Sequence, residues 1–220
     1  MHTRTALVLG ATGLVGQEVV RQLLDSPAYS SVAILTRRPL DWESPKLHQH
    51  IVQFDELEVY AAQFQVHDVY CCLGTTIKKA KTKEQFWKVD YEYTIQAAKL
   101  AAGQGVQNFL VISSMGASEK SLFFYSQVKG RMERELKQLP IRSIHVLRPS
   151  LLLGEREEFR FGEKLAEKVS AAFPFLYSGA LRKYRPITAE QVAKAMCRLA
   201  LADGKGIHVH ESDELGGNDK

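Results

Sequence analysis

The stretch TALVLGATGLVGQEVVRQLLD, residues 5–25, decides the fold of this chain. Its first six residues, 5–10, are mostly apolar and β-branched, which is typical of a buried strand. The segment LVGQEVVRQLLD, residues 14–25, places apolar residues at the spacing of an amphipathic helix. Between the two, GATGLVG carries three glycines where the strand must turn directly into the helix. We therefore expect a strand, a tight turn and a helix at the start of a βαβ unit.

The glycine spacing in this turn indicates a phosphate-binding role. Gly10 permits the tight turn, Gly13 lets the backbone approach a pyrophosphate, and Gly16 lets the helix pack closely on the strand. The N-terminus of the helix then offers unpaired N–H groups and the positive end of its dipole. The spacing is G-x-x-G-x-x-G rather than the common G-x-G-x-x-G, but its strand–turn–helix context is the required one. The alternative is an ordinary tight turn. The coenzyme contacts expected here are Gly10, Thr12, Gly13, Leu14, Val15 and Gly16.

The rest of the chain continues the alternation of strands and helices. Further strands are expected at residues 31–37, 50–54, 66–74, 106–114 and 141–149, and helices at 84–105 and 125–139. This alternation predicts an α/β, Rossmann-type doubly wound parallel sheet with helices on both faces. After about residue 150 the alternation of strands and helices becomes less regular. A helix is expected within 151–173, another at 188–202 and an edge strand at 206–210. We expect one domain, residues 1–220, with a core over about 1–150 and a small C-terminal substrate lobe over about 151–212.

Composition and charge favour an ordinary globular protein of a reducing compartment. The 220 residues carry a net charge of +4 and only three cysteines, too few for a disulfide framework. No targeting segment and no apolar run of about 20 residues is evident, so we expect a cytoplasmic protein without a membrane partner. The modest positive charge does not demand nucleic acid. His208 and His210 share one strand face without a further ligand nearby, and no metal site is expected.

The end of the second strand bears on the choice of coenzyme. NAD-specific sites usually place an acidic residue about 20 positions beyond the glycine turn, where it binds a ribose hydroxyl. This chain has LTRRP there, with Arg37 and Arg38 in place of a carboxylate. Guanidinium groups suit a 2′-phosphate. We therefore expect NADP(H) rather than NAD; the alternative is that both arginines are simply solvated.

A second motif, YSQVK, puts Tyr125 and Lys129 four residues apart on the helix expected at 125–139. A free tyrosine has a pKa near 10, and a nearby ammonium stabilises the phenolate form. The strand VQNFLVISS ends in Ser113 and Ser114, and a serine hydroxyl there can hold a substrate oxygen. These groups predict acid–base chemistry at the carboxyl edge of the sheet, against the alternative of two residues that share a helix surface.

The order of these motifs resembles the short-chain dehydrogenase/reductase superfamily, of the atypical kind. More narrowly, HDVYCCLGTT, WKVDYEY, VISSMGAS and LFFYSQVKGRMERELK are similar to the Tat-interacting-protein family of NADP-binding oxidoreductases and its bacterial relatives. The resemblance implies Tyr125 as proton donor and acceptor, Lys129 beside it, and Ser114 in preference to Ser113 as the catalytic serine. It places Tyr125, Lys129, Leu73 and Gly74 by the coenzyme. Where many members of the superfamily carry an asparagine that supports a proton relay, this chain has Asp90.

The leading interpretation is an NADP(H)-dependent oxidoreductase that acts on a small carbonyl or alcohol. One alternative is a regulatory protein that binds NADPH and captures a partner without turnover. Another is a nucleotide-sugar epimerase or dehydratase, although the short C-terminal segment argues against a nucleotide-sugar site. Dimers are common among the relatives, so a homodimer is the expected assembly if the chain is not a monomer.

Overall fold

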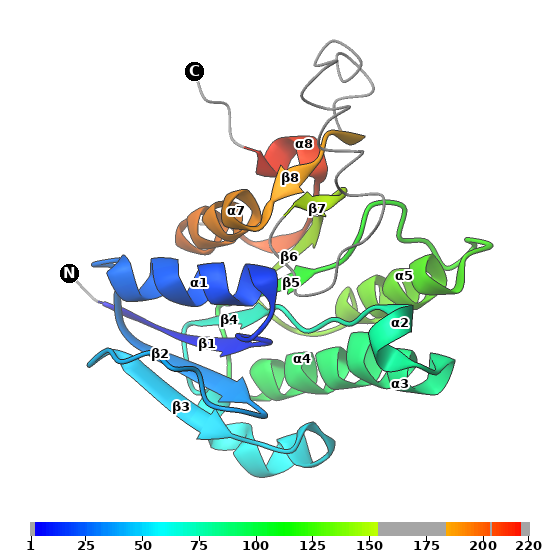
Figure 1. The fold of residues 1–220 in the computed structure, drawn as a ribbon. Coiled ribbons are helices and arrows are strands. Elements are labelled where there is room, and N and C mark those ends of the chain that lie inside the picture. The colour runs from blue at the N-terminus through cyan, green and yellow to red at the C-terminus, as the bar shows by residue number, and fades with distance from the viewer. Residues whose placement is uncertain (1–2, 154–183, 203, 217–220) are drawn as a thin grey trace.

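The computed structural model describes residues 3–153, 184–202 and 204–216 of the chain. Its centre is a parallel sheet of seven strands in the order β3-β2-β1-β4-β5-β6-β9 (Figure 1). The strands are β1 (Arg4–Leu9), β2 (Tyr29–Thr36), β3 (Leu47–Ile51), β4 (Asp68–Cys71), β5 (Asn108–Ile112), β6 (Ser143–Arg148) and β9 (Gly206–Glu211). The chain runs outward from β1 to β3 and then returns to β4. The order therefore confirms a doubly wound, Rossmann-type sheet whose switch point lies between β1 and β4.

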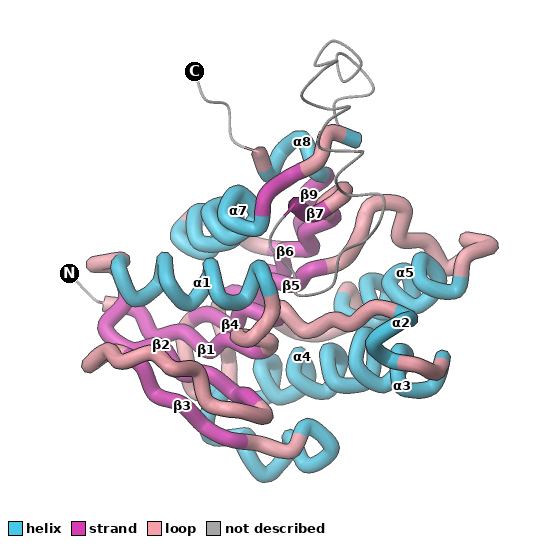
Figure 2. Tube along the Cα trace, in the orientation of Figure 1, coloured by secondary structure: helices cyan, strands magenta, loops and turns pink. Residues whose placement is uncertain are grey.

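Helices cover both faces of the sheet, as Figure 2 shows. The helices α1 and α7 lie on one face, and the turns of η1 lie with α4 and α5 on the other. Their bounds are α1 (Leu14–Asp25), η1 (Phe54–Phe64), α2 (Ile77–Ala80), α3 (Lys83–Trp87), η2 (Lys88–Glu92), α4 (Tyr93–Gly103), α5 (Phe124–Leu136), α7 (Ala189–Leu201) and α8 (Ser212–Leu215). None of the helices within the described ranges is long and apolar enough to cross a membrane.

Side-chain alternation along the strands separates two apolar cores. On β1, Leu7 and Leu9 point to the core under η1, α4 and α5. Ala6 and Val8, one residue out of phase, point to the core under α1 and α7. All four side chains are 1% exposed or less, which explains why the first strand has no polar position in this stretch.

Two segments differ from the sequence expectation, and a third lies outside the described residues. The strand expected at 50–54 lies at Leu47–Ile51, because β3 pairs with β2 from Leu47 onward and the chain then turns into η1. The long helix expected at 84–105 contains a π-helical turn, η2, between α3 and α4. The helix expected within 151–173 lies outside the described residues from residue 154 onward.

The C-terminal segments that the structure describes lie with the main sheet. β9 pairs in parallel with β6 and forms one edge of the sheet, as the sequence suggested for 206–210. The helix α7, expected at 188–202, packs against α1 over the sheet face. Its N-cap is Thr188, whose side chain accepts a hydrogen bond from the backbone of Gln191 in a capping box. Apart from these elements, β7 (Leu152–Leu153) and β8 (Ile187–Thr188) form a small second sheet.

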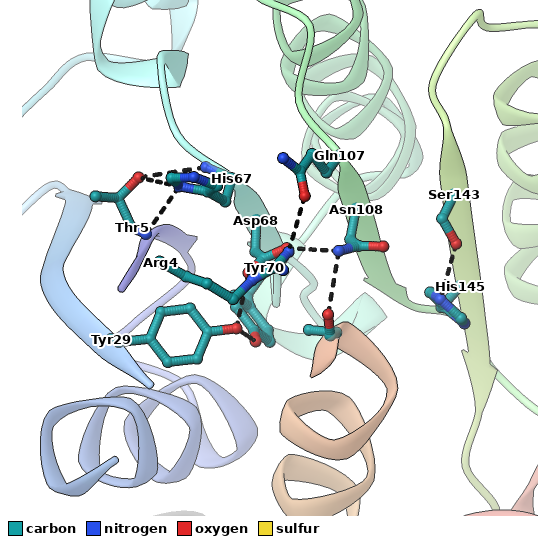
Figure 3. A network of polar contacts seen from close by, with 11 residues as sticks. Arg4, Thr5, Tyr29, His67, Asp68, Tyr70, Gln107, Asn108, Ser143 and His145 are labelled. Atoms are coloured by element: carbon teal, nitrogen blue, oxygen red, sulfur yellow. Dashed lines mark hydrogen bonds and ion pairs between the residues drawn. The ribbon is translucent and has the colours of Figure 1, made fainter. Parts of the chain in front are cut away.

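A buried polar network lies at the amino ends of β1, β4 and β5, opposite the edge that carries the glycine turn (Figure 3). The fully buried Asp68 carboxylate accepts two hydrogen bonds of 2.6 Å from Arg4. It accepts further bonds from the Tyr29 hydroxyl at 2.8 Å and the Asn108 amide at 2.7 Å. A buried carboxylate needs such partners to offset its lost hydration. With Tyr29 at the start of β2, the network therefore ties four neighbouring strands together, β2, β1, β4 and β5.

A histidine cluster joins the edge strand β9 to β6. His145 stacks on His208 and His210 with ring centroids 5.1 and 5.3 Å apart, and His145 Nδ1 lies 3.1 Å from His210 Nε2. The Ser143 hydroxyl lies 3.0 Å from His145 Nε2. Burial, followed by the positive charge that His210 and His208 would carry, lowers the pKa of His145 to about 4. His145 is therefore neutral in the folded protein at ordinary pH.

This cluster predicts a loss of stability in mild acid. The unfolded chain binds a proton at His145 near pH 6.5, whereas the folded chain does so only near pH 4. The contribution of neutral His145 to the unfolding free energy, up to about 3 kcal/mol, is thus complete above about pH 6.5. It is lost as the pH falls towards 4. Denaturant titrations at several pH values should show this fall in the unfolding free energy. His145→Asn should flatten it, and an unchanged slope in that variant would contradict the assignment.

Candidate active site

The glycine turn lies at the switch point of the sheet and is tightly packed. Gly10 has a φ of +80°, and a Cβ on it would lie 2.4 Å from the carbonyl oxygen of Cys72. A Cβ on Gly16 would lie 2.1 Å from the carbonyl oxygen of Gly10. Neither position accepts a side chain without movement of the backbone. Gly10 and Gly16 therefore have the roles predicted for them, a left-handed turn and close packing of helix on strand.

The N-terminus of α1 is open to a ligand at the carboxyl edge of β1. Gly13 is the N-cap residue, and within the described part of the chain no side-chain cap hydrogen bond is formed at this position. The N–H groups of the first turn, which includes Leu14, Val15 and Gly16, have no partner within the helix. No acidic residue lies in this turn, and Thr12 and Gly13 are exposed. The turn thus offers N–H groups and a positive dipole end that fit the diphosphate of a dinucleotide.

Two loops flank this turn. The turn after β4 brings Leu73 and Gly74 next to it, since Gly10 touches the backbone at Cys72 and Leu73. Arg37 and Arg38 follow the end of β2 and are both exposed. The Thr36 hydroxyl donates a hydrogen bond of 2.7 Å to the carbonyl oxygen of Arg38, which holds that loop. Neither guanidinium pairs with any of the residues that the structure describes.

Tyr125 and Lys129 lie one turn apart on α5, with different environments. Tyr125 is 37% exposed, and its ring packs on Phe86 of α3 with centroids 5.4 Å apart. Lys129 is 2% exposed. A Cβ on Gly130 would lie 2.4 Å from the backbone nitrogen of Glu119, so the loop after β5 lies directly on α5. The glycine after the lysine therefore keeps the serine loop and the Tyr-x-x-x-Lys helix in contact.

The Lys129 ammonium is held by two oxygen atoms. Its Nζ lies 2.9 Å from Asp90 Oδ1 of η2 and donates to the carbonyl oxygen of Ile112, at the end of β5, at 3.2 Å. Burial alone would lower the pKa of Lys129, but attraction to Asp90 and to Tyr125 outweighs it, so the pKa is raised above its ordinary value. The lysine is therefore charged and fixed beside the tyrosine.

The two serines after β5 have different surroundings. The Ser113 hydroxyl donates a hydrogen bond of 2.5 Å to Glu133 on α5. The Ser114 hydroxyl is buried and has no hydrogen-bond partner among the described residues. A buried hydroxyl without a partner is costly unless a ligand or water meets it. Ser113 thus has a structural contact, and Ser114 is the one with free hydrogen-bonding capacity.

Sequence reasoning missed the ion-pair network beside these groups. Arg148, at the end of β6, donates to both oxygens of the buried Glu133 at 3.0 and 2.6 Å, and to Glu211 of β9 at 2.9 Å. Glu133 follows Lys129 by four residues, so helical spacing alone could have placed both on one face of α5. The partner Arg148 could not be found that way, because its position depends on the order of the strands.

Comparison with known proteins agrees with an NAD(P)H-binding domain of this fold. A family model described as NAD(P)H-binding matches residues 10–203. Protein HTATIP2 of Rattus norvegicus is 35% identical over 210 residues, which cover 94% of this chain and 85% of that protein. Protein FMP52, mitochondrial, of Candida albicans is 34% identical over 224 residues, with 98% and 96% coverage. The fungal name refers to mitochondria, so the cytoplasmic compartment of this chain stays a prediction.

Solved structures share the fold at low identity. WbmG of Bordetella bronchiseptica in complex with NAD superposes with a TM-score of 0.71 at 13% identity, over 97% of this chain and 74% of that one. The UDP-glucose 4-epimerase of Thermotoga maritima superposes with a TM-score of 0.68 at 15% identity, over 93% and 75%. Together with the matched family model and the relatives above, the geometry leads to one conclusion: the chain belongs to the NAD(P)H-binding family that includes HTATIP2 and the FMP52 proteins.

Proposed function

We propose that the protein is an NADP(H)-dependent oxidoreductase of the short-chain dehydrogenase/reductase type, acting on a small carbonyl or alcohol. The observation that carries the proposal is that an exposed Tyr125 and a buried, charged Lys129 lie one turn apart on α5, with the Lys129 ammonium bonded to the Ile112 carbonyl at the end of β5. Two residues further on, the buried Ser114 hydroxyl has no hydrogen-bond partner among the described residues. All three lie at the carboxyl edge of the sheet that also carries the open helix N-terminus. An ordinary surface pair would not require a buried ammonium.

Each residue has a role that follows from its surroundings. The hydroxyl of the exposed Tyr125 side chain gives a proton to the substrate oxygen in reduction and takes it back in oxidation. The Lys129 ammonium stabilises the phenolate form that Tyr125 passes through. Ser114 donates its unused hydrogen bond to the same substrate oxygen and steadies the developing charge. The coenzyme, when bound, supplies or accepts the hydride at the substrate carbon.

The residues of the coenzyme site fit a dinucleotide. The N–H groups at the start of α1 would hold the diphosphate, while Leu73 and Gly74 would line the site from the β4 side. Lys129 would also hold the nicotinamide ribose, as the resemblance to the superfamily implies. Arg37 and Arg38 would hold the 2′-phosphate, because they are exposed, cationic and close to the turn.

The coenzyme preference can be tested on these two arginines. The double variant Arg37→Ala/Arg38→Ala should weaken NADPH binding by roughly 30-fold or more, or about 2 kcal/mol, since even one charge-assisted hydrogen bond to the phosphate contributes about 1.5–3 kcal/mol. The affinity for NADH should change little, because NADH lacks the phosphate. Fluorescence titration with both coenzymes measures the ratio. An unchanged NADPH/NADH ratio would remove the arginines from the site.

Turnover is tested with a panel of aldehydes and ketones. The protein is incubated with NADPH that carries deuterium at nicotinamide C4, and the alcohol product is analysed by mass spectrometry. We expect NADPH to be consumed and deuterium to appear on the former carbonyl carbon of at least one substrate. If the protein binds NADPH but no carbonyl compound causes NADPH consumption or deuterium transfer, the oxidoreductase proposal is refuted. The regulatory, partner-binding alternative would then be favoured.

The epimerase alternative gives a different result in the same assay. An epimerase or dehydratase of nucleotide sugars would retain oxidised coenzyme through purification and would show no net consumption of NADPH. The matched solved structures, including an epimerase, are longer than this chain, which covers about three quarters of them. The shared fold therefore does not favour this alternative.

A further inference from the structure

Asp90 occupies an unusual place for a carboxylate. It lies in η2, the π-helical turn between α3 and α4, and is 1% exposed. Turns of this kind are rare and are frequent at functional sites. Where many superfamily members have an asparagine, this chain thus places a full negative charge in the interior, which is costly unless it is paired.

The Asp90 carboxylate joins Lys129 to the turn after β4. Asp90 Oδ1 lies 2.9 Å from Lys129 Nζ, and Oδ2 accepts a hydrogen bond of 2.8 Å from the backbone N–H of Thr75. A Cβ on Gly74 would lie 3.4 Å from Oδ1, so the carboxylate also lies directly under the turn that follows β4. A single side chain therefore holds both the ammonium and the loop beside the glycine turn.

Few other charges act on the lysine. From β4, the Cys71 thiol is fully buried, and burial raises its pKa to about 11, so it is neutral at ordinary pH. From the same helix, Tyr125 attracts the ammonium. From the end of β5 comes only the carbonyl oxygen of Ile112. Among the described groups that raise the pKa of Lys129, which are Asp90, Tyr125 and Cys71, Asp90 is the carboxylate.

We propose that Asp90 is a positioning residue that keeps the buried Lys129 protonated. It also couples the lysine to the turn after β4, which lines the proposed coenzyme site. A buried lysine without a counter-ion gives up its proton readily. With Asp90 present, the attraction between the two side chains contributes to a pKa of Lys129 that is raised despite burial, and the lysine stays protonated. Asp90 thus holds the Lys129 ammonium and the turn after β4 in place. It does not take over the proton relay that the superfamily asparagine supports.

The consequence for turnover rests on the proposed function, but the central test does not. Lysine is labelled with 13C at Cε, and the Lys129 signal is assigned by its loss in Lys129→Met. In the wild-type protein this signal should stay in the ammonium form throughout the neutral range. In Asp90→Asn the midpoint of its titration should fall by at least about one pH unit. Asp90→Glu, which restores the charge on a longer arm, should recover most of the shift.

A matched control is available in the exposed pair of Lys88 and Asp55, which are 2.6 Å apart. Asp55→Asn should leave the Lys129 titration unchanged. An Asp90→Asn protein whose Lys129 titrates as in the wild type would overturn the proposal. If Asp90→Asn does not fold, the double variant Asp90→Asn/Lys129→Met, which removes both charges, should restore folding, and failure to do so would equally refute it. Where turnover is measurable, Asp90→Asn should lose activity as the pH rises while the wild type does not.

Discussion

Tyr125→Phe should lower kcat by roughly 10³-fold, the range expected when a positioned acid–base group is removed. The substitution deletes only the hydroxyl, and the ring that packs on Phe86 remains. The affinity for NADPH and the unfolding free energy should therefore stay close to those of the wild type. Turnover is followed through NADPH consumption with the substrate found in the carbonyl screen, and coenzyme binding by fluorescence.

The control for this variant is Tyr93→Phe. Tyr93, the first residue of α4, donates a hydrogen bond of 2.6 Å to the exposed Asp55 of η1. Its loss should leave kcat unchanged within about a factor of two, since an exposed hydrogen bond contributes little. Activity of Tyr125→Phe comparable to that of Tyr93→Phe would show that another group moves the proton.

Gly10→Ala should both destabilise the protein and strongly weaken coenzyme binding. The new Cβ would meet the carbonyl oxygen of Cys72 at 2.4 Å, so the glycine turn and the turn after β4 must separate. Beyond the cost of an alanine in a left-handed backbone conformation, we expect this overlap to lower the unfolding free energy by about 3 kcal/mol. The NADPH affinity should fall by at least about 100-fold, or 2.7 kcal/mol, because both turns line the same site.

Gly105→Ala separates the two causes of this effect. Gly105 has a φ of +70°, close to that of Gly10, but apart from its chain neighbours no described residue comes within 4 Å of its added Cβ. It should show only the cost of a left-handed backbone, about 1–2 kcal/mol, with normal coenzyme affinity. If Gly10→Ala behaved like Gly105→Ala in both measurements, the close contact between the turns would not matter for coenzyme binding.

Local patterns made the fold and part of the site predictable. The strand, turn and helix over residues 5–25 have their periods and glycines within one continuous stretch, and α1 spans Leu14–Asp25 as expected. The helical spacing of Tyr125 and Lys129 likewise follows from neighbouring residues. Such features depend on chain geometry over a few residues, which is why sequence alone can express them.

Contacts between distant segments were not predictable in the same way. The pairing of Asp90 with Lys129 depends on η2 packing against α5, and the pairing of Arg148 with Glu211 depends on β9 lying next to β6. The sequence marked Asp90 as a departure from the superfamily pattern but did not show what it contacts. Similarly, Arg4 and Asp68 meet only because β1 and β4 are neighbours in the sheet.

The most direct test of the account is a fluorescence titration of the purified protein with NADPH and, separately, with NADH. The open N-terminus of α1 predicts saturable binding, and the exposed Arg37 and Arg38 predict that NADPH binds at least about tenfold more tightly, a difference of 1.4 kcal/mol. Failure of both coenzymes to bind would contradict the assignment of the glycine turn, and tighter binding of NADH would contradict the proposed role of the arginines.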